Sequence, residues 1–442
     1  MTEYLTKNFK KRIYRLALGV LVAYFIIFRA NGVKAASLPN DVTTCGELDA
    51  EGTYTIKNDI GTTSPISGTC LTVNAYNVTI VGNGHTIYGT GSGSIGINVG
   101  TDIANGNGFG TTTVSNLNIA GFGKSFYSLG GAYGGNGGVG GSVVLSHVDF
   151  SGSVTSLGGG GYHAGSSGLI YVDLSSISGD LTSIGGSGFY DGGASGSISI
   201  NSSSVTGAIT STAGTSIAGN VVSSGSISIN SSSVTGAIIS TGVGGHGNYG
   251  GNGASITIDN SHSGSVYSGG GSGNSNGGDG GAINITSSSI ISGSVSSSGG
   301  VGVGTNGGAG GSITIDNSQT GDVISAGGYG QNHGGSTGSI SVNSGSITGA
   351  ITSAGGTTGG RGGGSSGSIS LDSSSVTGAI TSTGGNAIDD GGRPGSISIN
   401  SSSVTATTTS TGGYSWGGSN GGAGGLITID NSQTGDVNSG GG

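Results

Sequence analysis

Apolar and polar residues alternate in short segments that recur along most of the chain. In the segment 198–200 two isoleucines flank a serine, the period-two pattern of a strand with one buried face. Equivalent segments begin at Val143, Ile170, Ile198, Ile227, Ile256, Ile283, Ile313, Ile340, Ile369, Ile397 and Ile427. Successive starts are 27 to 30 residues apart and average 28.4 residues. The region 141–442 is therefore a repeat array of eleven units, the last of them truncated.

Each unit predicts three short strands. In the unit that begins at Ile198, the turn-like residues 201–203 precede Val205 and Ile209, which are further inward candidates, and a Gly/Ser-rich connector follows. No part of the array has helical periodicity. Stacked coils lie about 4.8 Å apart, so each strand can pair with its equivalents in the coils above and below. We therefore expect an all-β fold, a right-handed parallel β-helix with about 28 residues per coil.

The third predicted strand supports this stacking, because its first residue is apolar in nearly every unit. The column contains Val154, Leu181, Ile209, Ile238, Val266, Val295, Val323, Ile351, Ile380, Thr408 and Val437. Only Thr408 departs from the pattern. One coil alone buries too little apolar surface to offset its ordering entropy, so the array is expected to be stable only collectively.

A polar column follows the first strand. It contains Ser146, Asp173, Asn201, Asn230, Asp259, Thr286, Asp316, Asn343, Asp372, Asn400 and Asp430. Asn and Asp suit corners because their side chains bond nearby backbone and tolerate a left-handed conformation. Calcium binding along this stripe is the alternative. Its aspartates never occupy neighbouring coils, so they would lie about 10 Å apart, too far to share an ion, and we favour structural corners.

The Gly-rich connectors are expected to emerge together on one edge of the solenoid as exposed loops. Many carry aromatic residues: Tyr133, Tyr162, Phe189, Tyr190, Tyr249, Tyr329, Tyr414 and Trp416. Loops on a rigid scaffold often carry binding function. Tyr329, Tyr414 and Trp416 are our predicted contacts for a glycan or another cell-surface ligand. The alternative is that the rings only cover neighbouring loops and glycine backbone.

The first 35 residues have the features of a signal peptide. A basic segment precedes the apolar run 16–28, and small residues before Ala36 suit cleavage after Ala35. An uncleaved membrane anchor is the alternative. We expect a secreted or cell-surface protein with an N-terminal cap and irregular coils in 36–140, followed by the regular coils of 141–442. An open last coil would be prone to aggregation, so we expect that the natural protein continues beyond Gly442 or is capped by a partner.

Net charge and amino-acid composition limit the classes of molecule that the protein is expected to bind. Residues 36–442 hold nineteen acidic and four basic residues, a net charge of −15 that disfavours nucleic acids and anionic lipids. The 105 glycines follow no collagen period, and only 7% of the residues are charged. We expect a monomeric rod.

The chain has two cysteines, Cys45 and Cys70, both in the first part of the exported chain. In an oxidising compartment they are predicted to form a disulfide that staples the N-terminal cap.

Two sequence segments resemble known proteins. Residues 77–89, NVTIVGNGHTIYG, resemble the opening coil of pectin-lyase-like parallel β-helix proteins. Units such as 311–318, GSITIDNS, resemble repeats of bacterial β-helix surface proteins and autotransporter passengers. The resemblance implies a parallel β-helix over roughly residues 45–442, and says little about activity because that fold hosts lyases, hydrolases, adhesins and stalks.

Candidate catalytic chemistry is sparse. Asp389 and Asp390 precede Arg393, and residues 245–247 spell the Gly-His-Gly of polygalacturonase-like hydrolases, but His246 lies about five coils before Asp389, or ~25 Å away. Catalytic groups must reach one substrate, so we predict no catalytic residues. We also predict no metal site and no cofactor. Adhesion through the loops is the favoured function, with a pectin-lyase-like carbohydrate-active enzyme or an inert spacer as alternatives.

Overall fold

The computed structural model describes residues 40–442 except 103–105, 134, 220–221, 246, 248 and 291–292. The predicted signal peptide, residues 1–35, and His246 lie outside the described residues. The chain divides into residues 1–40 and a compact second unit, residues 41–442, and the fold described below belongs to this second unit. The described residues contain no helix that is long and apolar enough to span a membrane.

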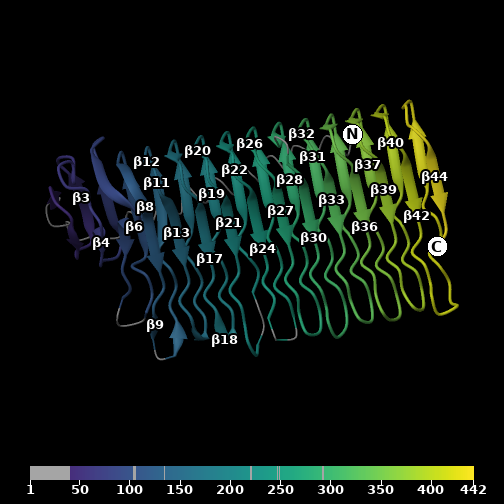
Figure 1. Cartoon of the computed structure of the whole chain (residues 1–442), viewed down its shortest axis with the longest axis horizontal. Coiled ribbons are helices and arrows are strands. Elements are labelled where there is room, and N and C mark those ends of the chain that lie inside the picture. The colour runs from purple at the N-terminus through teal and green to yellow at the C-terminus, as the bar shows by residue number, and fades with distance from the viewer. Residues whose placement is uncertain are drawn as a thin grey trace, which may run out of the picture. The chain divides into compact units, whose positions relative to one another are not determined.

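The second unit is a parallel β-solenoid, as predicted, and three stacks of strands run along it (Figure 1). The first stack is a 15-stranded sheet. Its strands are β1 (Asn40–Val42), β3 (Gly52–Ile56), β5 (Val78–Val81), β7 (Thr111–Ser115), β11 (Ser142–Ser146), β15 (Ile170–Asp173), β19 (Ile198–Asn201), β22 (Ile227–Asn230), β25 (Ile256–Asp259), β28 (Ile283–Thr286), β31 (Ile313–Asp316), β34 (Ile340–Asn343), β37 (Ile369–Asp372), β40 (Ile397–Asn400) and β43 (Ile427–Asp430).

The second stack contains two-residue strands. They are β12 (Asp149–Phe150), β16 (Ser176–Ile177), β20 (Ser204–Val205), β23 (Ser233–Val234), β26 (His262–Ser263), β29 (Ser289–Ile290), β32 (Gln319–Thr320), β35 (Ser346–Ile347), β38 (Ser375–Val376) and β41 (Ser403–Val404). In the early coils, the long strands β6 (Thr86–Val99) and β8 (Asn118–Leu129) pair along their length with two register shifts and run on into the third stack.

The third stack returns each coil toward the connector. Besides the ends of β6 and β8, its strands are β2 (Gly46–Leu48), β4 (Thr69–Val73), β13 (Ser153–Leu157), β17 (Leu181–Ile184), β21 (Ile209–Thr212), β24 (Ile238–Thr241), β27 (Val266–Gly269), β30 (Val295–Ser298), β33 (Val323–Ala326), β36 (Ile351–Ala354), β39 (Ile380–Thr383), β42 (Thr408–Thr411) and β44 (Val437–Gly440). Four short strands lie in the connectors: β9 (Ala132–Tyr133), β10 (Asn136–Gly137), β14 (Gly161–His163) and β18 (Gly188–Asp191).

The strand register confirms the columns predicted from the repeat. Ile170 pairs with Ile198 and Ile200 with Ile229 in the first stack. In the third stack, Thr408 pairs with Ile380 and Val437, as predicted. The inward side chains of all three stacks form one continuous apolar core. Parallel pairing thus places equivalent residues of neighbouring coils directly above one another along the array.

Cys45 and Cys70 form the predicted disulfide, and their Cα atoms are 4.5 Å apart. Cys70 lies in β4 and is buried in the core, and the half-buried Cys45 packs against that core. The bond joins the first two coils.

The corner after the first strand differs from the prediction by one residue. The Asn/Asp column ends the strand, and the next residue takes the left-handed conformation, as at Ser202 with φ 47° and Asn260 with φ 48°. The column side chains bond one another between coils instead: the Asn201 amide donates to Asp173 over 2.7 Å, and the Asn230 amide donates to Asn201 over 2.9 Å. These ladders support the structural interpretation of the column.

A buried serine ladder closes the same corner. The Ser203 hydroxyl donates to the carbonyl oxygen of Asn201 over 2.6 Å and accepts from the backbone N–H of Ser175 over 3.0 Å. The next coils repeat this arrangement at Ser232 and Ser261. The serines of the repeat therefore satisfy backbone groups that the tight corner would otherwise leave unpaired.

Candidate binding surface on the loop edge

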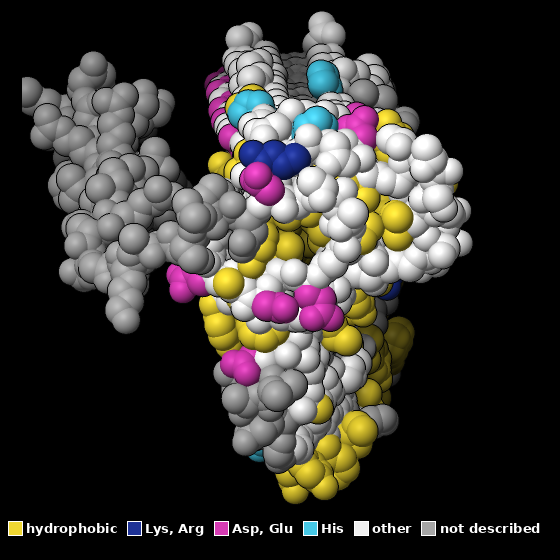
Figure 2. All heavy atoms as spheres, turned by 90° about the vertical axis from the view of Figure 1, so that its left-hand side faces the viewer, with side chains coloured by type: hydrophobic (Ala, Val, Ile, Leu, Met, Phe, Trp, Pro, Cys, Tyr) yellow, Lys and Arg dark blue, Asp and Glu magenta, His cyan; other side chains and the backbone are white. Residues whose placement is uncertain are grey.

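The connectors between the third and first strands stack into one edge of the solenoid, the lower edge in Figure 1. We call the tips of these connectors the loop edge. The sequence predicted their common position. Hydrophobic side chains gather at this edge, where they form the bottom of the view in Figure 2.

The connectors themselves are not open loops, because in seven of them two glycine pairs pack against each other and against the next coil. We call these pairs the glycine seam: 185–186 with 192–193, 270–271 with 277–278, 299–300 with 307–308, 327–328 with 334–335, 355–356 with 363–364, 384–385 with 391–392 and 412–413 with 421–422. Most of these glycines are buried. The prediction of exposed Gly-rich loops is therefore wrong for the seam and holds only for the tips.

Backbone hydrogen bonds run through the seam from coil to coil. The N–H of Gly335 donates to Gly328 in the same connector over 2.9 Å, and the N–H of Gly356 in the next coil donates to Gly335 over 2.8 Å. The alternation continues through Gly364 and Gly385, at 2.9 and 2.8 Å. The seam thus ties each of these connectors to its neighbours by backbone hydrogen bonds.

A second serine column joins the seam to the apolar core. Ser183, Ser211 and Ser268 of the third strands are fully buried. Their hydroxyls donate to the returning chain, over 3.0 Å to Gly196, 2.8 Å to Gly225 and 2.8 Å to Ala254. This serine column provides hydrogen-bond donors for backbone carbonyl oxygens where the third strands meet the Gly-rich connectors.

Four aromatic side chains meet at the loop edge. Tyr162 and His163 extend from β14, and Phe189 and Tyr190 from β18 in the following coil. The rings of Phe189 and Tyr190 are perpendicular at 5.0 Å, and Tyr162 lies 6.3 Å from Phe189 and 6.1 Å from Tyr190. Tyr162, Phe189 and Tyr190 remain 57%, 43% and 48% exposed. We call these four residues the aromatic cluster.

His163 is fixed within the aromatic cluster. Its ring stacks on Tyr190 at 5.5 Å, and its Nδ1 lies 2.7 Å from a carboxylate oxygen of Asp191. Because β14 and β18 are paired, the backbone sets the spacing of all four rings. The cluster is therefore a half-exposed aromatic platform on two paired strands, with one carboxylate at its rim.

The sequence identifies Tyr162, Phe189 and Tyr190 as connector aromatics but does not bring them together, and it assigns His163 no part in a binding surface. A spacing of 27 residues, the length of one coil, separates Tyr162 from Phe189. The same spacing separates His163 from Tyr190. That spacing alone does not identify the cluster, because the connectors differ in length from coil to coil.

The three contacts predicted from the sequence lie on two loops, with Tyr329 on one connector and Tyr414 and Trp416 together on another, three coils further along. Tyr329, Tyr414 and Trp416 are 43%, 62% and 66% exposed. Among the described residues no ring contact joins them to one another. Their role as ligand contacts stays a prediction.

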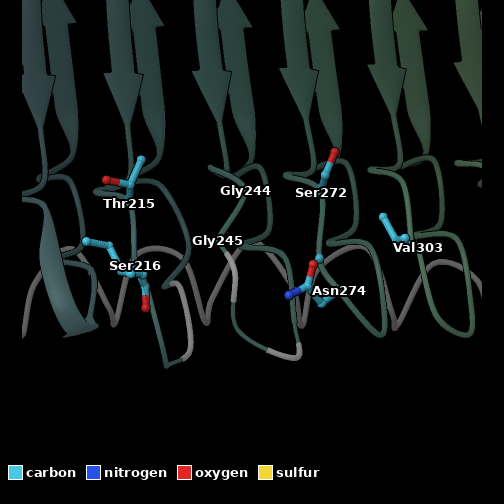
Figure 3. Close-up of a pocket in the computed structure, with 9 residues that line it drawn as sticks. Thr215, Ser216, Gly244, Gly245, Ser272, Asn274 and Val303 are labelled. Atoms are coloured by element: carbon cyan, nitrogen blue, oxygen red, sulfur yellow. The ribbon is translucent and has the colours of Figure 1, made fainter.

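A groove lies beside the aromatic cluster on the loop edge. It has a volume of about 410 Å³ and is lined by loops of four successive coils, from Thr215 to Val303 (Figure 3). Its lining combines hydroxyl, amide, aliphatic and glycine groups.

Titratable groups elsewhere have local structural partners. A hydrogen bond from the Thr86 backbone, together with one to His85, holds the pKa of Asp59 below its usual value. Burial, aided by the carboxylate of Asp173, raises the pKa of Tyr171. Neither group lies at the loop edge.

The candidate catalytic residues do not form a described site. Asp389, Asp390 and Arg393 are exposed in a connector, and His246 lies outside the described residues. Within the described ranges no group of three or more His, Cys, Asp or Glu residues could hold a metal ion.

Comparison with known proteins leaves the ligand open. No family model and no curated protein matches the sequence. One solved structure that matches is the surface protein and adhesin PfbA of Streptococcus pneumoniae, with 12% identity, coverage of 88% of this chain and 90% of that chain, and a TM-score of 0.22. A second structure of PfbA has 12% identity, coverage of 88% and 83%, and a TM-score of 0.19. At such low similarity the ligand must be argued from this chain's own surface.

Proposed function

We propose that the protein is an exported or cell-surface solenoid that adheres to glycans through its loop edge. The aromatic cluster is the observation that carries the proposal. Three rings are held in mutual contact and remain about half exposed. Exposed aromatic surface of this kind is costly to leave in water unless it contacts a partner.

Aromatic rings suit a sugar ligand because a sugar ring has a face of C–H groups and a rim of hydroxyls. The C–H face can lie on Tyr162 or Phe189, while the phenol groups and Asp191 can bond the hydroxyls. The paired strands β14 and β18 hold these groups in place before binding, which reduces the entropy lost on association.

The disulfide supports export, because such bonds persist mainly outside the cytosol. The proposed signal peptide would deliver the chain there, and its cleavage after Ala35 remains part of the proposal. The net charge of −15 for residues 36–442 fits an extracellular scaffold that does not bind nucleic acid.

A glycan array tests the proposal with purified protein. The cluster variant Tyr162→Ser/Phe189→Ser/Tyr190→Ser should lose about 30-fold in affinity for any glycan that the wild type binds, the loss of about 2 kcal/mol expected for a central aromatic anchor. The variant Tyr329→Ser/Tyr414→Ser/Trp416→Ser tests the sequence-predicted contacts in parallel.

Tyr267→Ser is the matched control, because Tyr267 is an exposed tyrosine on β27, away from the loop edge. It should bind like the wild type. Unfolding midpoints must show that every variant is folded. Equal binding by the cluster variant would refute the role of the cluster, and a folded wild type that binds no glycan would leave the spacer interpretation standing.

A further inference from the structure

The groove beside the aromatic cluster has a glycine floor between two aliphatic walls. Ile217 and Val303, each 57% exposed, stand at its two ends. Between them, Gly244 and Gly245 line the groove without side chains, and Ser272 and Asn274 add hydroxyl and amide groups (Figure 3). None of the described residues that line the groove is charged. Its volume of about 410 Å³ is in the range of small-ligand sites.

The groove is built onto the aromatic cluster. The backbone N–H of Ile217 donates to Gly188 over 3.2 Å, and the next residue, Ala218, donates to Phe189 over 2.7 Å. The hydroxyl of Ser216 donates to the carbonyl oxygen of Tyr190, also over 2.7 Å. The first wall of the groove is therefore hydrogen-bonded to β18, which carries half of the cluster.

Cluster and groove form one surface across six successive loops. The loops carry Tyr162, Phe189, Ile217, Gly245, Gly273 and Val303 in that order. Five steps between coils of about 4.8 Å give a length of ~24 Å. A monosaccharide would cover only part of this surface, whereas a chain of sugars could touch both ends.

We infer that the loop edge binds a neutral, linear oligosaccharide, one part of which occupies the groove while the rest passes over Ile217 onto the aromatic cluster. This inference rests on the proposed function and names its ligand class. The described part of the groove's lining offers no cation to pair with an acidic sugar and no carboxylate to pair with an amino sugar. The net charge of −15 adds repulsion against polyanions.

The ligand's chain length is the variable that tests the inference. Glucose and N-acetylglucosamine oligosaccharides, from disaccharide to octasaccharide, are titrated against the protein by calorimetry. Affinity should rise by about tenfold or more with length and then become constant once the chain spans both parts of the surface. Sulfated dextran should not compete with the neutral chains.

Ser272→Tyr fills the groove without touching the cluster, because Ser272 is exposed on the loop. It should remove the gain in affinity with length and leave disaccharide binding unchanged. Ile217→Ser lowers the wall between the two parts and should weaken only the longer chains. Ser370→Tyr is the control, since Ser370 is an exposed serine on the outer face of β37.

The inference would be overturned by affinity that does not depend on length, by a full length effect in folded Ser272→Tyr, or by tighter binding of sulfated than of unmodified dextran. Failure of every neutral oligosaccharide to bind would overturn it as well. The proposed function itself fails only if the wider glycan array is also negative, so the two failures are distinguishable.

Discussion

At the scale of single residues, the glycine seam has a steric cause. A Cβ atom built on Gly356 would lie 2.0 Å from the carbonyl oxygen of Gly328 in the preceding coil. On Gly385 it would lie 1.9 Å from the oxygen of Gly356. The obstacle is backbone held by its own hydrogen bonds, so no side-chain movement can relieve the contact. Glycine occupies these positions because nothing larger fits.

Gly356→Ala should therefore destabilise the solenoid by about 1–3 kcal/mol, the usual cost of overpacking a closely packed interior. The change is read as a lower denaturation midpoint and as faster amide exchange in the coils around residue 356. Gly359→Ala is the control in the same connector, because Gly359 is exposed and its nearest atom is the mobile hydroxyl of Tyr329 at 3.1 Å. Equal midpoints for the two variants would mean that the seam can expand.

At the scale of elements, the columns show how much the sequence could predict. Period-two alternation and the 28-residue repeat located the first and third strands, because apolar residues at fixed spacing leave few registers. The sequence predicted the left-handed conformation at the Asn/Asp column, as at Asn201, whereas the structure has it one residue later, at Ser202. The error arose because one side chain alone does not determine the backbone torsion.

The glycine seam and the aromatic cluster were beyond the sequence for a different reason. Both depend on contacts between connectors of successive coils, and connector lengths vary, so the partner of a given glycine cannot be counted from the repeat. The pairing of Gly356 with Gly335 and the meeting of Tyr162 with Phe189 became visible only once the strands had fixed the stacking.

The third-strand column contains a buried hydroxyl group whose contribution to stability can be tested by mutation. Thr408 is fully buried between Ile380 and Val437, and its hydroxyl has no hydrogen-bond partner in the structure. Thr408→Val keeps the shape and removes the unpaired hydroxyl, so it should raise stability by about 1 kcal/mol. A higher denaturation midpoint would show this gain.

Thr409→Val is the paired control, because Thr409 points outward from the same strand and is only half-buried. It should change the midpoint little. A loss of stability in Thr408→Val would mean that the hydroxyl has a partner, such as a bound water, that compensates its burial.

At the scale of the whole molecule, the stability of each coil depends on its contacts with its neighbouring coils. Ile380, with a coil on each side, is fully buried, whereas Val437, with a coil on one side only, is 44% exposed. Each coil therefore completes the burial of the next, which is the behaviour of a quasi-one-dimensional array. A local defect should remain local, and it should matter most near an end.

The disulfide between Cys45 and Cys70 tests this locality, because it lies in the first coils and closes a loop with a sequence separation of 25. Cys45→Ala/Cys70→Ala should cost about 3 kcal/mol on the chain-entropy estimate. Amide exchange should accelerate in β2 to β6 and stay unchanged beyond β15, because opening the first coils need not unfold the others. Reduction of the wild type should reproduce the pattern, and uniform acceleration through β44 would show instead that the solenoid unfolds as one cooperative unit.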